Sequence, residues 1–95
     1  MLGIETDLQG STAVMRISGN LDGESRQMFA RASKLLMGNE KVSKIEIDVS
    51  SVSYIDSSAC GMLHVVKDKA VQAGKTIAIV KAKGLVKSAL GLFKL

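Results

Sequence analysis

Apolar and polar residues alternate in two short runs near the start of the chain, as is typical of strands with one buried face. These runs cover residues 4–8 and 12–18, and the turn signal Gln9-Gly10-Ser11 separates them. The pattern predicts a β-hairpin. A third alternating run, Lys44 to Val49, predicts another strand.

Helical spacing of apolar residues predicts three helices. The first spans residues 23–37, with Asp22 as its N-cap and Gly38-Asn39 as its stop. The second spans Ser58 to Ala73, and the short third spans Lys83 to Leu90, with Gly91 as its cap. The predicted buried stripe of the first helix comprises Met28, Phe29, Ala32, Leu35 and Leu36.

Between the last two helices, Thr76 to Val80 forms a continuous apolar run, which predicts a buried central strand. Leu92 to Leu95 is a candidate for a last edge strand. Two strand–helix–strand crossovers imply partly parallel pairing with right-handed connections. We therefore predict a single α/β domain over residues 1–95, with a mixed sheet of four or five strands and about three helices packed on one face.

Composition narrows the classes of function. The net charge is +4, but the basic residues are scattered and only three residues are aromatic, which disfavours a nucleic-acid groove. The single Cys60 excludes an intramolecular disulfide and fits a reducing compartment. No apolar run is long enough for a membrane span and no signal-peptide core precedes the domain, so we expect a cytoplasmic protein.

The sequence offers little support for a catalytic site. His64 is the only histidine, and it lies nearly two helical turns beyond Ser58, too far to serve that hydroxyl as a base. Neither a phosphate-binding loop nor a dinucleotide fingerprint occurs. Cys60 lies in the first turn of a helix, where a thiolate is favoured, but a small buried hydrophobe is the better interpretation. We expect no enzymatic activity, no cofactor and no metal.

The segment Tyr54 to Gly61 carries the most information. Asp56, Ser57 and Ser58 lie where the second helix begins, and free N–H groups with the positive end of the helix dipole favour anions there. Asp56 suits a cap of the nearby backbone. Ser58 suits either a helix cap or a phosphate carrier, and the residues alone favour the cap.

The segment Asp48 to Gly61 resembles the signature loop of STAS domains, the anti-sigma factor antagonist family. That loop follows an Asp-Leu-Ser-like strand end with Asp-Ser-Ser-Gly-Leu-Gly. Gly19-Asn20-Leu21-Asp22 resembles the family's Gly-Glu-Leu-Asp, residues 91–94 resemble the end of its penultimate helix, and the order of elements agrees over the whole chain. Ala59 and Cys60 depart from the usual Gly and Leu.

The resemblance implies a phosphorylation switch on the second serine of the motif, Ser58, with Ser57 as the competing site. The implied kinase is a histidine-kinase-like ATPase that often doubles as the anti-sigma factor, and a PP2C-type phosphatase reverses the modification. The unmodified protein would bind this partner, or a response regulator, and phosphorylation would release it. The expected partner-binding residues are Asp22, Asp56, Ser57, Ala59, Cys60 and Met62.

Two alternatives to the switch stay open: a transporter subunit, and a ligand-sensing domain, which would need an apolar pocket with convergent polar groups. Small STAS proteins also serve as non-catalytic subunits of ABC-type lipid transporters, although those tend to lack a phosphorylatable second serine. Many family members continue into a further helix, so we expect an exposed apolar patch near Leu85, Val86, Leu92 and Phe93. Such a patch suits weak homodimerisation or partner docking.

Overall fold

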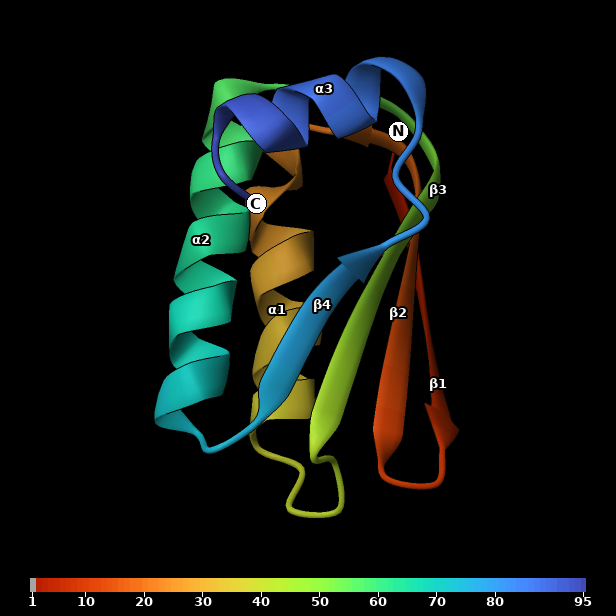
Figure 1. Cartoon of the computed structure of the whole chain (residues 1–95). Coiled ribbons are helices and arrows are strands. Elements are labelled where there is room, and N and C mark those ends of the chain that lie inside the picture. Colours follow the sequence, from red (N-terminus) through yellow and green to blue (C-terminus); the bar gives the residue numbers. More distant parts are fainter. Residues whose placement is uncertain (1) are drawn as a thin grey trace.

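A four-stranded mixed sheet, in the order β1-β2-β3-β4, forms one layer of the computed structural model, which describes residues 2–95 (Figure 1). β1 (Leu2–Gln9) pairs antiparallel with β2 (Thr12–Leu21) through a turn in which Gly10 has a φ of 64°. β3 (Lys44–Ile55) runs parallel to β2, and β4 (Thr76–Val80) runs parallel to β3. The predicted α/β fold and the hairpin are confirmed.

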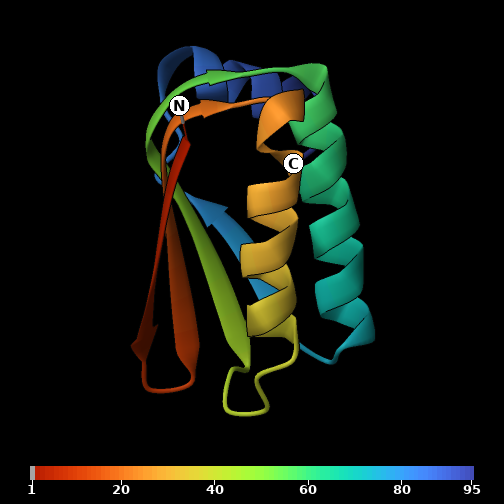
Figure 2. The ribbon, with the colours of Figure 1, turned by 180° about the vertical axis from the view of Figure 1, so that it is seen from behind.

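Two helices lie side by side on one face of this sheet (Figures 1 and 2). They are α1 (Arg26–Met37), preceded by the short 3-10 helix η1 (Gly23–Ser25), and α2 (Ser57–Gln72). The third helix, α3 (Gly84–Leu92), crosses the end of the sheet near which β3 leads into α2. Within residues 2–95, no helix combines the length and the apolar character that a membrane crossing requires.

The core lies between the sheet and the two long helices. Ile17, Ile45 and Ile47 project from the sheet and pack against Phe29 of α1 and Leu63 of α2. Each of these side chains is about 1% exposed or less, and burying one contributes about 1.5–3 kcal/mol. Val86 and Leu90 of α3 join the same core, which fixes the third helix to the domain.

Several predicted boundaries are wrong. β4 is an edge strand, because β3 is its only paired neighbour among the described residues. Residues 92–95 add no strand: α3 continues through Gly91 to Leu92, and the Leu95 N–H donates to the carbonyl of Leu90. β3 extends beyond Val49 to Ile55, because its polar second half pairs with the end of β2.

The buried stripe of α1 also differs from the prediction. Met28 and Leu35 are 49% and 73% exposed, whereas Ser33 is buried. The Ser33 hydroxyl donates to the carbonyl of Phe29 at 2.8 Å, which satisfies a polar group that would otherwise be costly to bury. The helix therefore buries a narrower apolar face than its sequence indicates.

On the face of the sheet away from α1 and α2, Asp48 is a nearly buried carboxylate. Its Oδ1 accepts the Ser50 N–H at 2.9 Å, and its Oδ2 lies 3.6 Å from Lys81 Nζ. Hydrogen bonding by the Ser50 side chain, and then by its backbone N–H, holds the pKa of Asp48 below its ordinary value, although burial opposes the shift. The ionised form therefore stabilises the fold.

This arrangement predicts a pH-dependent effect of Asp48→Asn. Because the folded-state pKa is lowered, the stabilisation is present above the ordinary pKa of 3.8 and disappears as the pH falls through the folded value. At neutral pH the variant should lose about 1.5–3 kcal/mol of unfolding free energy, as expected for hydrogen bonds to a charged group. Urea unfolding of both proteins between neutral pH and pH 3 checks this, and a difference that stays constant below about pH 4 would contradict it.

Candidate functional site

The carboxyl ends of the parallel strands β2 and β3 meet at one edge of the sheet. Leu21 and Ile55 are register partners there, and the Asp56 N–H donates to the Leu21 carbonyl at 3.3 Å. The chain leaves both strands at this point and enters a helix each time (Figure 1). Asp22 and Asp56, which are far apart in sequence, therefore begin neighbouring helical segments.

Asp22 caps the first of these segments. Its Oδ1 accepts the N–H groups of Glu24 at 3.1 Å and Ser25 at 3.2 Å, and the Ser25 hydroxyl donates to the same oxygen at 3.0 Å. This geometry confirms the predicted N-cap, although the helix begins with the 3-10 turn η1 before α1.

Asp56 caps α2. Its Oδ1 accepts the Ala59 N–H at 2.9 Å, and its backbone is extended, as an N-cap residue requires. Ser57 and Ser58 are the first two residues of the helix, and both are exposed. The alternative that Ser58 caps the helix is wrong, because Asp56 occupies that position and the Ser58 hydroxyl forms no hydrogen bond with the described part of the chain.

Gly23 lies directly beside Ser58. A β-carbon built on Gly23 would stand 3.7 Å from the Ser58 Oγ, which is ordinary van der Waals contact. The start of η1 and the start of α2 therefore touch, and the missing side chain of Gly23 leaves the serine hydroxyl open on that side.

Three of the predicted partner-binding residues lie in the next turn of α2. The side chains of Ala59 and Cys60 are 0% exposed, so the partner contact predicted for these two residues stays a prediction that their side chains do not support. The helix turns these positions toward the sheet. Met62 is also largely buried, but it lines a surface groove.

Cys60 is a small buried hydrophobe, as the better of the two sequence interpretations predicted. Burial raises the pKa of its thiol, and the negative charge of Asp56 adds to the effect.

His64 is half-buried, and its hydrogen-bond partner is not Ser58. Its Nε2 is hydrogen-bonded to the carbonyl of Phe93, which ties α2 to the segment after α3. The histidine has this structural contact in place of the free surface position that the sequence indicated.

An open groove of about 760 Å³ runs between α1 and α2, and we call it the α1–α2 groove. Sequence reasoning missed it, although the cations of the first helix were a usable signal. Its lining residues come from both helices and comprise Arg26, Phe29, Ala30, Ser33, Lys34, Met37, Ser58, Gly61, Met62, Val65, Val66 and Lys69. Ser58 thus belongs both to the start of α2 and to this groove.

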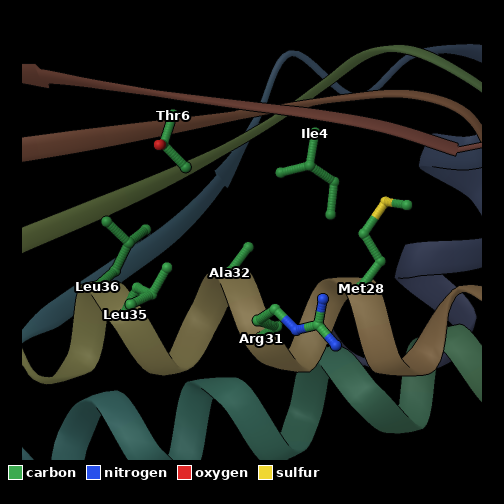
Figure 3. Close-up of a pocket in the computed structure, with 7 residues that line it drawn as sticks. All are labelled: Ile4, Thr6, Met28, Arg31, Ala32, Leu35 and Leu36. Atoms are coloured by element: carbon green, nitrogen blue, oxygen red, sulfur yellow. The ribbon is translucent and has the colours of Figure 1, made fainter.

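A smaller hollow of about 250 Å³ lies on the other flank of α1, against β1. Figure 3 shows Ile4 and Thr6 facing α1 across it, with Arg31 along the helix. Its volume is too small for most ligands of protein pockets, which occupy about 300–1,000 Å³.

The predicted apolar patch on α3 is present in part. Leu85 and Leu92 are 88% and 82% exposed, and Phe93 is 41% exposed. Val86 was wrongly included, because it faces the core.

Comparison with known proteins finds a matching family and solved structures with the same fold. The family model described as "Mlab, STAS domain" matches residues 4–95. A putative anti-sigma factor antagonist from Thermotoga maritima has a TM-score of 0.84 at 20% identity, over 96% of this chain and 78% of that one.

Two further solved structures share the fold. The Bacillus cell fate determinant SpoIIAA in its phosphorylated form has a TM-score of 0.73 at 16% identity, over 96% of this chain and 87% of that one. The murine anion transporter Slc26a9 has a TM-score of 0.77 at 16% identity, over 90% of this chain but only 14% of the transporter.

The division of roles between Asp56 and Ser58 predicts unequal effects on stability. Asp56→Ala removes the cap of α2 and should lower the unfolding free energy by about 1 kcal/mol. Ser58→Ala removes an exposed hydroxyl without a partner and should change it by less than about 0.5 kcal/mol. Urea denaturation followed by circular dichroism measures both, and an equal cost for the two variants would mean that Ser58 also caps the helix.

The burial of Cys60 predicts an unreactive thiol. At neutral pH the folded protein should react with a thiol-specific disulfide reagent far more slowly than the protein unfolded in guanidinium chloride, because burial hinders both ionisation and access. Absorbance after mixing reports the rate. Equal rates in the two states would show that Cys60 is accessible.

Proposed function

This chain belongs to the STAS domain family, and we propose that it is a non-enzymatic, cytoplasmic binding module whose partner affinity is controlled by phosphorylation of Ser58. The unmodified form binds a protein partner at the start of α2. Phosphorylation releases that partner.

The exposed Ser58 hydroxyl, which the fold does not use, is the observation that carries this proposal. Asp56 caps the helix, so a kinase can modify Ser58 without removing an internal hydrogen bond. Gly23 leaves the hydroxyl uncovered. Ser57, which is also exposed, is the competing site.

A phosphate at Ser58 adds about −1.5 to −2 charge at neutral pH. The first N–H groups of α2 and the positive end of its dipole favour an anion there, so the fold tolerates the modification. A partner in contact with this surface instead meets a bulky, strongly hydrated group. Desolvating that group costs binding energy without any change of fold.

The neighbouring residues have distinct proposed roles. Asp56 holds the start of α2 in place and presents a carboxylate beside the serine, while Asp22 orders the adjoining turn. The surface that a partner contacts then comprises Asp22, Asp56, Ser57 and the part of Met62 that lines the α1–α2 groove. Ala59 and Cys60 contribute only by packing beneath it.

The proposed partners follow from the family. They are a histidine-kinase-like ATPase that acts as serine kinase and anti-sigma factor, or a response regulator, with a PP2C-type phosphatase to restore the free serine. The structure of the Bacillus relative in a phosphorylated form supports a phosphate on this fold.

A second candidate is a non-catalytic subunit of an ABC-type lipid transporter. The likeness to a domain of the murine anion transporter favours it, because there the same fold is part of a transport protein. In this case the start of α2 would dock permanently and Ser58 would stay unmodified.

Affinity purification with four baits separates these candidates. The baits are the wild type, Ser58→Ala and Ser58→Asp, with Ser53→Asp as a charge-matched control at an exposed serine of β3. We expect Ser58→Ala and Ser53→Asp to retain a kinase or response regulator and Ser58→Asp to lose it at least tenfold, or about 1.4 kcal/mol. Mass spectrometry should also find phosphate on Ser58 of the wild type.

Retention of the same transporter subunits by all four baits, with no phosphate on Ser58, would refute the switch and support the second candidate. Circular dichroism of Ser58→Asp provides the folding control, because the proposal requires this variant to stay folded.

A further inference from the structure

The α1–α2 groove has an apolar floor and low walls. Phe29, Met62 and Val66 form buried parts of its lining. Val65 is 51% exposed, and Ala30 faces solvent from the opposite helix. Because α1 and α2 lie side by side along their length (Figure 2), the groove between them has the shape that receives a third helix packed by its apolar face.

The charges around the groove have one sign. Arg26 and Lys34 line it from α1, and Lys69 lines it from α2. None of the described residues that line it is acidic, and the sequence of α1 contains no carboxylate at all. A partner helix that fits this rim carries Asp or Glu on both sides of its apolar face.

Gly61 gives a second, independent indication that another molecule packs in the groove. A glycine inside a helix costs about 1 kcal/mol relative to alanine. Nothing lies within 4 Å of a β-carbon built on Gly61, so internal packing does not require the glycine. Its position in the wall of the groove, between Ser58 and Val65, instead permits the backbone of another molecule to come close.

From these features we propose that the α1–α2 groove binds an amphipathic helix of the partner protein, with its apolar face on the floor and acidic residues against Arg26, Lys34 and Lys69. This inference rests on the proposed function, because the partner is the one that Ser58 controls. Ser58 lines the same groove. A phosphate there repels the acidic flank of the bound helix, which gives the release step a direct electrostatic cause.

A second copy of this chain does not match the groove. α1 and α3 contain no acidic residue, and Asp68 is the only one in α2. None of the three helices therefore offers an apolar face with acidic flanks. The occupant is a different protein.

Two peptides provide defined probes. The first is a helical peptide of about 14 residues, four turns, with leucine and alanine on one face and glutamate on both flanks. The second replaces every glutamate with lysine. Titration of the isotope-labelled full chain, followed by two-dimensional NMR, should give saturable shifts at Ala30, Gly61 and Val65 with the acidic peptide and at least tenfold weaker binding of the basic one.

Matched variants test the location. Lys34→Glu should weaken the acidic peptide at least fivefold, whereas Arg31→Glu, the same change of charge on the other flank of α1 (Figure 3), should have little effect. Val65→Glu should abolish binding and Val71→Glu should not, since Val71 is also exposed on α2 but does not line the groove. Gly61→Ala should raise thermal stability and still weaken binding.

Three results would overturn the inference. The two peptides could bind with equal affinity, the shifts could centre on Leu85 and Leu92 of α3, or no saturable shift could occur up to about 1 mM peptide. The Ser58→Asp variant distinguishes helix binding in the groove from the proposed phosphorylation switch. If this variant binds the acidic peptide as tightly as the wild type while Lys34→Glu does not, the groove is a helix site and the proposed phosphorylation control fails. If the purification baits show the switch but the groove gives no shift, the partner docks elsewhere.

Discussion

The parallel pairing of β2 with β3 is the constraint on which the site depends. It buries Ile45 and Ile47 against the helices, and it brings the carboxyl ends of two strands to one edge of the sheet. Each strand is followed by an aspartate that caps the next helical segment, so Asp22 and Asp56 become neighbours. With the pairing shifted, Gly23 would no longer lie beside Ser58.

Local signals allowed much of this arrangement to be predicted. Short stretches of sequence predict the hairpin, the cap by Asp22 and the two crossovers, because turns and caps depend on a few adjacent residues. The features that were missed depend on distant contacts. The polar second half of β3 is a strand only because the end of β2 pairs with it, and the edge position of β4 follows from the order of the whole sheet.

In the candidate site, too, local features were predicted and features that depend on distant contacts were missed. The motif identified Ser58 correctly as an exposed residue at the start of α2, and it also named Ala59 and Cys60 as partner-binding residues, whose side chains the helix turns into the core. The α1–α2 groove was missed because its two walls come from helices separated by the whole of β3, so the cations of α1 alone did not define it. One residue, Ser58, belongs both to the start of α2 and to the groove, so the proposed site of phosphorylation adjoins the proposed docking site.

The register of Leu21 with Ile55 also has a consequence for the order of folding. The loop between these two residues contains α1 and most of β3, so the contact is non-local and its formation carries a loop-closure cost. α1 and the hairpin can form early from local contacts, yet the two capped helix starts come together only afterwards. The surface around Ser58 is therefore absent from chains in which β2 and β3 have not yet paired.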